Sequence, residues 1–219
     1  MIADRIFAAI LAIVFPAWTV WLGRKPKAGS GPDGRARRMI RTLVVAYGLA
    51  LLGAAIWFVS GRSLALLGLE WPLSGASVLL LLASAVLIVF AVVWVRLVKP
   101  SAAQDLAVSK ALPGSLGKTL LYVVTMLSLG AIWEVLYRGY LIWALGQFTG
   151  LWPAVIIAAV SYGLAHGIKS KKQVVTSLIS ALVFSGAYAL SHSLWWLILV
   201  HCALPLLPFA ARRREVQAV

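Results

Sequence analysis

The chain has 219 residues, of which 62% are hydrophobic and only 12% are charged, and its formal net charge is +14. Soluble domains carry roughly 45–50% apolar and about 25% charged residues, so this composition excludes an ordinary soluble domain. Disorder is excluded as well, because disordered segments have low hydrophobicity. The sequence therefore predicts an integral membrane protein, and its length fits a single transmembrane domain over residues 1–219.

Seven apolar segments along the chain are candidates for membrane-spanning helices. A helix needs about 20 predominantly apolar residues to cross the hydrocarbon core of a bilayer. The seven segments are 6–22, 39–60, 75–95, 119–147, 151–168, 173–190 and 194–211. We therefore expect an all-α integral membrane protein, with about seven transmembrane helices in a bundle.

The basic residues explain the net charge without a nucleic-acid partner. Seventeen of the twenty Lys and Arg residues fall at or just outside the ends of the apolar segments, in clusters at 24–41, 96–118, 169–172 and 212–214. Basic loops stay on the cytoplasmic side of a membrane, and the clusters occupy every second loop only if 119–147 is one long helix. This pattern predicts an outside N-terminus, a cytoplasmic C-terminus and a flexible basic cytoplasmic loop at 23–38.

Very few ionisable side chains fall inside the apolar segments. Glu134 is the only acid within one, and Arg138 is the only base apart from Arg41 at the start of 39–60; the four-residue spacing of Glu134 and Arg138 puts them on one helix face. His166 ends the fifth segment and His201 lies in the seventh. A charge at the membrane centre costs at least about 2.5–3.5 kcal/mol, so such residues are functional candidates. We expect the four to form a polar site inside the membrane, although Glu134 and Arg138 alone can be a pair that only fixes helix packing.

The chemistry open to these residues is hydrolysis. A carboxylate with two imidazoles can activate water by general-base catalysis. Glu134, His166 and His201 also match the ligand set of a catalytic zinc site, so they would hold a divalent metal such as zinc if one is present. Arg138 can orient the carboxylate or stabilise developing negative charge. The spacing leaves open whether a metal takes part and whether the three helices converge.

Three short motifs resemble those of the CPBP family, which comprises CAAX-prenyl proteases and bacteriocin-processing membrane proteins, also called Abi proteins. Residues 133–141, Trp-Glu-Val-Leu-Tyr-Arg-Gly-Tyr-Leu, are similar to the first motif, Glu-Glu-x-x-x-Arg followed by Gly-Tyr-Leu. The stretch from Tyr162 to His166 is similar to Phe-x-x-x-His, and that from His201 to Pro205 is similar to His-x-x-x-Asn. Motif order and spacing agree over 118–211.

The resemblance implies a helical bundle with a cavity, and an endopeptidase that cleaves a membrane-associated protein or peptide in the cytoplasmic membrane of a bacterium. It implies that Glu134 activates the attacking water, that His166 and His201 assist, and that Arg138 lies beside them. Trp133 stands where the family has its first Glu, and Pro205 where it has Asn.

Two further interpretations remain open at this point. The departures at Trp133 and Pro205 are typical of a non-catalytic family member that binds a peptide or protein, as an immunity or scaffold protein does. A small transporter is the third interpretation, because ionisable residues within the membrane also mark ion paths.

Overall fold

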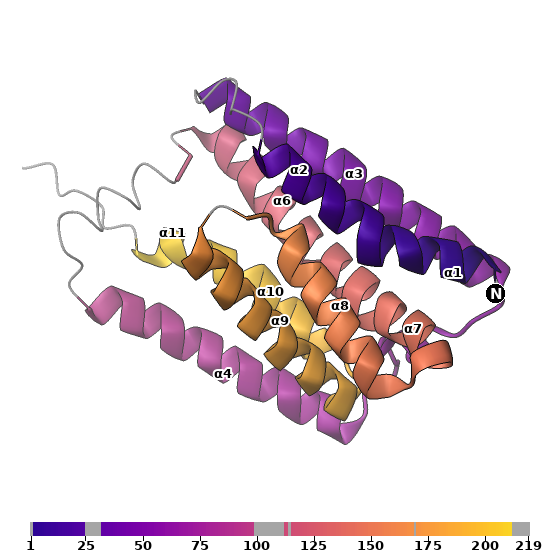
Figure 1. Ribbon diagram of the computed structural model, residues 1–219. Coiled ribbons are helices and arrows are strands. Elements are labelled where there is room, and N and C mark those ends of the chain that lie inside the picture. The colour runs from indigo at the N-terminus through magenta and orange to yellow at the C-terminus, as the bar shows by residue number, and fades with distance from the viewer. Residues whose placement is uncertain (1, 25–31, 99–111, 114, 169, 212–219) are drawn as a thin grey trace, which may run out of the picture.

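The structure is a computed structural model that describes the chain apart from residues 1, 25–31, 99–111, 114, 169 and 212–219. Within the described part every regular element is a helix, which confirms the predicted all-α fold (Figure 1). The elements are α1 (Ile2–Ala9), η1 (Ile10–Val14), α2 (Phe15–Arg24), α3 (Pro32–Val59), η2 (Leu64–Leu67), α4 (Gly75–Leu97), α6 (Leu116–Trp133), η3 (Glu134–Leu141), α7 (Ile142–Thr149), α8 (Leu151–Ala165), α9 (Lys171–Ser191), α10 (Trp195–Ala203), η4 (Leu204–Leu206) and α11 (Leu207–Ala211).

The helices form the predicted membrane bundle. Each of the seven apolar segments predicted from the sequence corresponds to one helical stretch of the described chain. Five stretches are long and apolar enough to cross a membrane, namely Ile2–Gly23, Ala36–Val59, Gly75–Leu97, Leu116–Thr149 and Lys171–Ser191. The other two, Leu151–Ala165 and Trp195–Ala210, are apolar but shorter. The expected helix count is therefore confirmed, with two of the seven too short to qualify as full spans.

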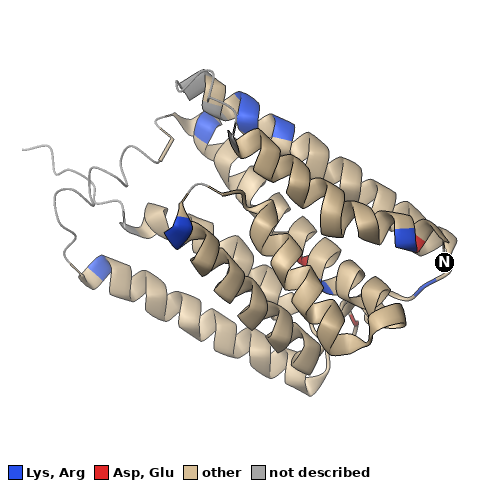
Figure 2. Cartoon of the chain, in the orientation of Figure 1, with Lys and Arg blue, Asp and Glu red and all other residues tan. Residues whose placement is uncertain are grey.

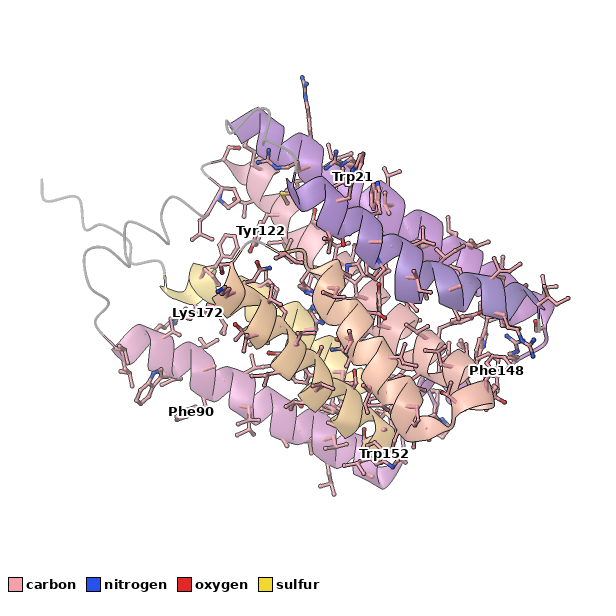
Figure 3. The ribbon with its side chains drawn as sticks, in the orientation of Figure 1. Trp21, Phe90, Tyr122, Phe148, Trp152 and Lys172 are labelled. Carbon is pink, nitrogen blue, oxygen red and sulfur yellow. The ribbon has the colours of Figure 1, made fainter. Side chains whose placement is uncertain are left out.

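The outer surface of the bundle is apolar, as lipid contact requires. Large hydrophobic side chains such as Trp21, Phe90, Phe148 and Trp152 are between 44% and 61% exposed and lie on the outside of the helices (Figure 3). In water such a surface would drive aggregation, but lipid tails are as apolar as these side chains. The integral membrane assignment thus rests on the exterior as well as on helix length.

Charged side chains separate toward the ends of the bundle. The start of α3, the end of α4 and the start of α9 carry Lys and Arg at one end, which we call the basic end (Figure 2). Helix α1, at the start of the chain, lies toward the opposite end (Figure 1). The predicted alternation of basic loops therefore agrees with the arrangement of the helices.

The predicted loop at 23–38 overlaps two helices of the structure. Helix α2 continues to Arg24, and α3 already begins at Pro32. Proline is favoured in the first turn of a helix, because its fixed φ suits the helix and its missing N–H is not needed there. The boundary at 38 is therefore wrong, and residues 25–31 lie outside the described residues.

A buried acidic residue, Asp4, lies close to the start of the chain. It lies within α1 and is only 4% exposed. Arg62 donates hydrogen bonds of 2.6 and 2.8 Å to its two carboxylate oxygens, and the Tyr140 hydroxyl donates a third of 2.8 Å. The Arg62 guanidinium also lies over the ring of Trp143, 4.4 Å from its centroid. A buried carboxylate is thus fully paired, and α1 is joined to the loop after α3 and to η3.

The long fourth segment is one continuous helix, as predicted, but its centre is not α-helical. Between α6 and α7 the eight residues of η3 form a π-helix. It begins at Glu134 and contains Arg138, so it coincides with the first family-like motif. Such π segments are rare and occur frequently at functional sites.

Candidate active site

Glu134 is the centre of a polar cluster inside the bundle. Its Oε1 accepts a hydrogen bond of 2.7 Å from Arg138 Nη1, one turn further along η3. The same oxygen lies 2.6 Å from Nδ1 of His201 on α10. The Glu134 and Arg138 side chains are each 1% exposed, whereas the His201 side chain is 26% exposed. Three of the four predicted site residues are therefore in direct contact.

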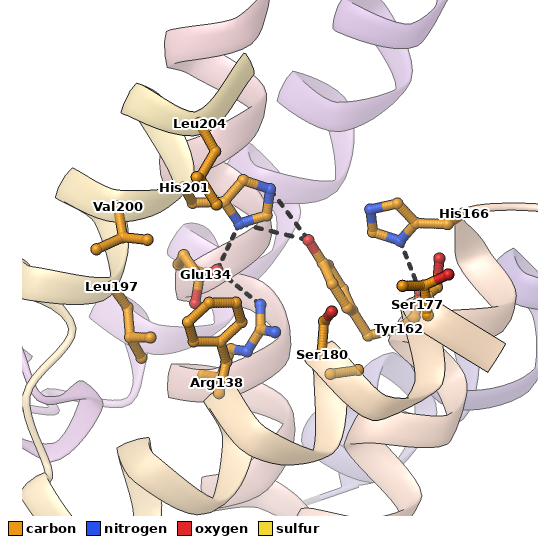
Figure 4. A pocket seen from close by; sticks show the side chains of 13 residues that line it. Glu134, Arg138, Tyr162, His166, Ser177, Ser180, Leu197, Val200, His201 and Leu204 are labelled. Atoms are coloured by element: carbon orange, nitrogen blue, oxygen red, sulfur yellow. Dashed lines mark hydrogen bonds and ion pairs between the residues drawn. The ribbon is translucent and has the colours of Figure 1, made fainter. Parts of the chain in front are cut away.

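Tyr162 and His166, both at the end of α8, complete the cluster. The Tyr162 hydroxyl lies 3.2 Å from His201 Nε2 and 3.4 Å from its Nδ1. His166 packs its ring edge-on against Tyr162, with 4.5 Å between centroids, and its Nδ1 donates to the Tyr162 carbonyl oxygen at 3.0 Å. Figure 4 shows the Tyr162 hydroxyl between the two imidazoles. His166 thus reaches the cluster through Tyr162 and not through Glu134.

Arg138 is held by aromatic rings as well as by Glu134. Its guanidinium carbon lies 4.2 Å from the centroid of the Tyr162 ring and 6.0 Å from that of Phe184. A desolvated guanidinium over an aromatic face is worth about 2 kcal/mol. Arg138 Nε and Glu134 Oε2 have no hydrogen-bond partner among the described residues. Each member of the ion pair thus keeps one polar atom without a hydrogen bond, beside the cavity.

A small residue on α6 brings α10 close enough for these contacts. A Cβ at Gly130 would lie 2.9 Å from Cys202 Sγ and 3.2 Å from the Cys202 backbone nitrogen. Cys202 follows His201 directly, and Gly130 lies one turn before Glu134. The absence of a side chain at Gly130 thus lets the two helix backbones approach at the level where His201 meets Glu134.

Two cavities meet at this cluster. The smaller has a volume of about 240 Å³ and is lined by Glu134, Arg138, Tyr162, His166 and His201 together with side chains of α9 and α10 (Figure 4). The larger, of about 700 Å³, reaches from Arg38 and Arg41 on α3 to Trp133, Tyr162, His166, His201 and Pro205. All four predicted site residues therefore line a cavity, and Tyr162, His166 and His201 line both cavities.

Trp133 faces the larger cavity. Its ring packs at 5.0 Å from Phe15 and at 6.0 Å from Tyr137, centroid to centroid. Glu134 lines the smaller cavity but not the larger. Adjacent helix positions point in different directions, so Glu134 does not take the place of the carboxylate that the family carries at position 133.

Comparison with known proteins matches the region that contains all of these motifs. Residues 115–207 match the family model described as Type II CAAX prenyl endopeptidase Rce1-like. Over these residues the chain matches the CPBP/CAAX protease family. Comparisons with curated proteins and with solved structures give no match. The match begins at the N-cap of α6 and ends within α11, and it includes Glu134, Arg138, His166 and His201.

The positions of Glu134, His166 and His201 bear on metal binding in this CAAX protease-like region. Among the described residues, no group of three or more His, Cys, Asp or Glu side chains is arranged to hold a metal ion. Glu134 and His201 contact each other directly, while His166 is hydrogen-bonded to a carbonyl of its own helix. Glu134, His166 and His201 therefore do not fit a shared zinc ion in this arrangement.

Sequence reasoning missed the part played by Tyr162. The CAAX protease-like motif has Phe at this position, and the change to Tyr adds one hydroxyl group to the site. The available signal was the spacing, because Tyr162 lies one helical turn before His166 and so shares its face. Pro205 lines the larger cavity, and its carbonyl accepts a 3.0 Å hydrogen bond from Tyr122.

Proposed function

We propose that the protein is an intramembrane endopeptidase that hydrolyses a peptide bond in a membrane-associated protein or peptide. The observation that carries this proposal is the 2.6 Å contact between His201 Nδ1 and Glu134 Oε1 at the wall of a polar cavity. The family match over residues 115–207 supports the same class of reaction.

The partner of His201 decides its tautomer. An ionised carboxylate only accepts hydrogen bonds, so His201 Nδ1 carries the proton and Nε2 is the basic nitrogen. Arg138 supplies the counter-charge for Glu134 on the same oxygen. A carboxylate that holds an imidazole by Nδ1–H is the arrangement that activates nucleophiles in hydrolytic triads.

We assign proton abstraction to His201 Nε2 and orientation of the ring to Glu134. The Glu134 side chain is 1% exposed and its Oε1 already accepts two hydrogen bonds, whereas the His201 side chain is 26% exposed to the cavities. His201 is therefore the residue that a water molecule can reach. Glu134 then stabilises the imidazolium that forms when the water gives up its proton.

The reaction needs one proton transfer in each direction. Water oxygen bonds to the peptide carbonyl carbon while His201 Nε2 takes the water proton. The carbon–nitrogen bond then breaks, and the imidazolium returns a proton to the leaving nitrogen, which gives a carboxylic acid and an amine. His166 Nδ1 donates to a backbone carbonyl, so its Nε2 is a second basic nitrogen that can assist this return.

Tyr162 supplies a hydrogen-bond donor for the oxyanion. In the resting site its hydroxyl donates to the unprotonated His201 Nε2 at 3.2 Å. When a water molecule takes its place at Nε2, the hydroxyl is released and can donate to the oxyanion. Pro205, at the position of the family Asn, offers no side-chain donor. A donor aimed at the developing negative charge lowers the barrier to hydrolysis.

Replacing Tyr162 by Phe is expected to lower kcat by about 10²-fold, because one oxyanion donor is lost. KM should change little, since the ring that packs on Arg138 and His166 is retained. The family itself carries Phe here, so the variant should fold, and thermal unfolding in detergent checks that. An unchanged kcat would remove the hydroxyl from the mechanism.

The basic end is proposed to face the cytoplasm, with the larger cavity open toward that side. Arg38 and Arg41 lie at one end of this cavity, and basic segments are retained on the cytoplasmic side. A substrate segment would then enter from the cytoplasmic leaflet of the bacterial inner membrane. Cysteine-accessibility labelling of single-cysteine variants near Arg62 and Lys118, in a Cys202→Ser background, tests this orientation.

The experiment that tests the activity maps new peptide ends. The purified protein in proteoliposomes is mixed with solubilised membrane proteins from cells that lack it, and new N-termini are labelled and identified by mass spectrometry. We expect a small set of cleavage sites that are absent with a Glu134→Gln, His201→Ala double variant. The same set of ends with wild type and double variant would overturn the proposal.

The second candidate function is a non-catalytic binding protein, which Trp133 and Pro205 favour. Trp133→Glu separates the two candidates, because it adds a carboxylate on the larger cavity beside His166 and His201. An added general base contributes about 10²–10⁴-fold, so we expect hydrolysis to rise by at least tenfold. Trp133→Gln is the control of matched size. Equal rates for the two variants would show that the larger cavity is not where the bond is cleaved.

A further inference from the structure

The first membrane helix, made of α1, η1 and α2, carries a proline near its middle. Pro16 has no N–H, so it cannot donate to the carbonyl of Ala12, its partner in an α-helix, or to that of Leu11, its partner in a π-helix. The residue before it donates elsewhere, because the Phe15 N–H bonds the Ile10 carbonyl at the end of η1. A buried carbonyl needs a partner, most of all inside a membrane. The two carbonyls beside Pro16 are therefore open to donors from other helices.

Tyr137 on η3 is the donor at the first of these carbonyls. Its hydroxyl donates to the Leu11 carbonyl oxygen at 3.1 Å, and the residue is only 1% exposed. Its ring packs edge-on against the ring of Tyr162, with 5.2 Å between centroids. Tyr162 in turn contacts His201 through its hydroxyl and Arg138 through its ring. The first helix thus reaches the proposed reaction centre through two aromatic rings.

A second hydroxyl lies at the neighbouring carbonyl. Ser161, the residue before Tyr162, lies 3.0 Å from the Ala12 carbonyl oxygen and 2.7 Å from the Ile157 carbonyl oxygen of its own helix. A serine hydroxyl has one proton, so it bonds one of the two oxygens or is shared between them. Tyr137 is therefore the firmer link between the first helix and the site.

We propose that Tyr137 is a positioning residue for the active site and that the first helix holds it in place. The Leu11 carbonyl, which Pro16 cannot supply with a donor, fixes the Tyr137 ring, and this ring fixes that of Tyr162. The kinetic consequence rests on the proposed peptidase, whereas the structural consequence can be measured without a substrate. The first helix then belongs to the site, although it lies outside the matched residues 115–207.

A second tyrosine on η3 provides the matched control. The Tyr140 hydroxyl donates to Asp4 on α1 at 2.8 Å, so it too bonds the first helix. Its ring packs against Phe7 and Trp57, and Tyr140 is not among the residues that line the two cavities beside the imidazoles. Tyr140→Phe therefore removes a hydroxyl from the same π segment and the same helix pair, at a distance from the reaction centre.

The structural consequence is tested by nitrogen NMR of protein labelled at histidine, in micelles. The chain has three histidines, and single Gln substitutions of the other two assign the His201 signals. Tyr137→Phe keeps the ring but loses the link to Leu11, so the Tyr162 hydroxyl should move relative to His201 Nε2. We expect a changed Nε2 signal, because the chemical shift of a ring nitrogen depends on the hydrogen bond that it accepts. Tyr140→Phe should leave the signal in place.

Pro16→Ala tests the same link from the other side. It restores a backbone N–H that competes with Tyr137 for the Leu11 carbonyl, so the His201 signal should change in the same direction. In this background Tyr137→Phe should add little. The double variant should fold even if Tyr137→Phe alone does not, because the Leu11 carbonyl keeps a donor.

Three outcomes would overturn the proposal. One is a wild-type His201 signal in Tyr137→Phe, or in the double variant with Pro16→Ala if Tyr137→Phe does not fold. Another is an equal change in Tyr140→Phe, since the effect would then be general loosening of η3. The third is a full additional effect of Tyr137→Phe in the Pro16→Ala background, which would separate Tyr137 from the first helix.

Turnover on an identified substrate measures the kinetic consequence. Small misplacements of reacting groups are costly, so Tyr137→Phe should lower kcat by about tenfold. KM should change little, because the ring that lines the larger cavity is retained. A changed His201 signal with unchanged kcat would uphold the positioning of the ring and count against His201 as the base. An unchanged signal would overturn the positioning role whatever the kinetics.

Discussion

Replacing Glu134 by Gln is expected to lower peptidase turnover by about 10²–10⁴-fold, the range that loss of an oriented general base produces. The Gln side chain keeps the size of Glu134 but has no charge to stabilise the His201 imidazolium. Its amide can also donate to Nδ1 and so turn the basic nitrogen away from the water. Initial rates on an identified substrate in proteoliposomes measure the effect. His201→Ala should be as inactive as Glu134→Gln, and the double variant no worse than either, because the two residues act as a unit.

A matched control for this substitution exists outside the site. Glu70→Gln makes the same chemical change at the opposite end of the bundle, where hydrogen bonds from Ser74 and then Ser77 lower the pKa of the Glu70 carboxyl. This variant should retain wild-type turnover. Full activity of Glu134→Gln, with normal unfolding temperature, would remove the carboxylate from the mechanism and favour the binding-protein interpretation.

Replacing Arg138 by Met is expected to destabilise the fold by about 3–5 kcal/mol, the cost of leaving one partner of a buried ion pair uncompensated. Glu134 would remain 1% exposed with no counter-ion, and the guanidinium packing on Tyr162 would be lost. Unfolding by denaturant in mixed micelles measures the change in free energy.

A double variant separates this effect from a general loss of packing. Glu134→Leu combined with Arg138→Met removes both charges and keeps the volume, and such replacements are often neutral or stabilising. We expect the double variant to recover most of the lost stability while it remains inactive. If the double variant is as unstable as Arg138→Met alone, the ion pair does not explain the destabilisation.

The sequence predicted the membrane bundle well because hydrophobic length alone determines a spanning helix. The seven segments and the Glu134–Arg138 pair follow from local patterns, and the single long fourth helix follows from the alternation of basic clusters along the chain. The register of Glu134 and Arg138 was predictable because four-residue spacing gives contact along one helix. The ion pair between Asp4 and Arg62 was not predictable in this way, because it depends on a contact between residues that are 58 positions apart.

The assembly of the site could not be read from the sequence in the same way. Contact between Glu134 and His201 depends on the close approach of α6 and α10 at Gly130, and nothing in the pattern marks that glycine. The π segment at Glu134 likewise has no compositional signature. His166 was expected to contact the Glu134 carboxylate. It packs instead against the ring of Tyr162, which also lies next to the His201 ring. Spacing identified the participants, but tertiary packing determined their partners.

The presence of His201 in the lining of two cavities has a consequence for a membrane enzyme. Glu134 lines only the smaller cavity, which has room for several water molecules, and Trp133 lines only the larger one. A peptide segment in the larger cavity and water in the smaller one can therefore both reach the His201 imidazole.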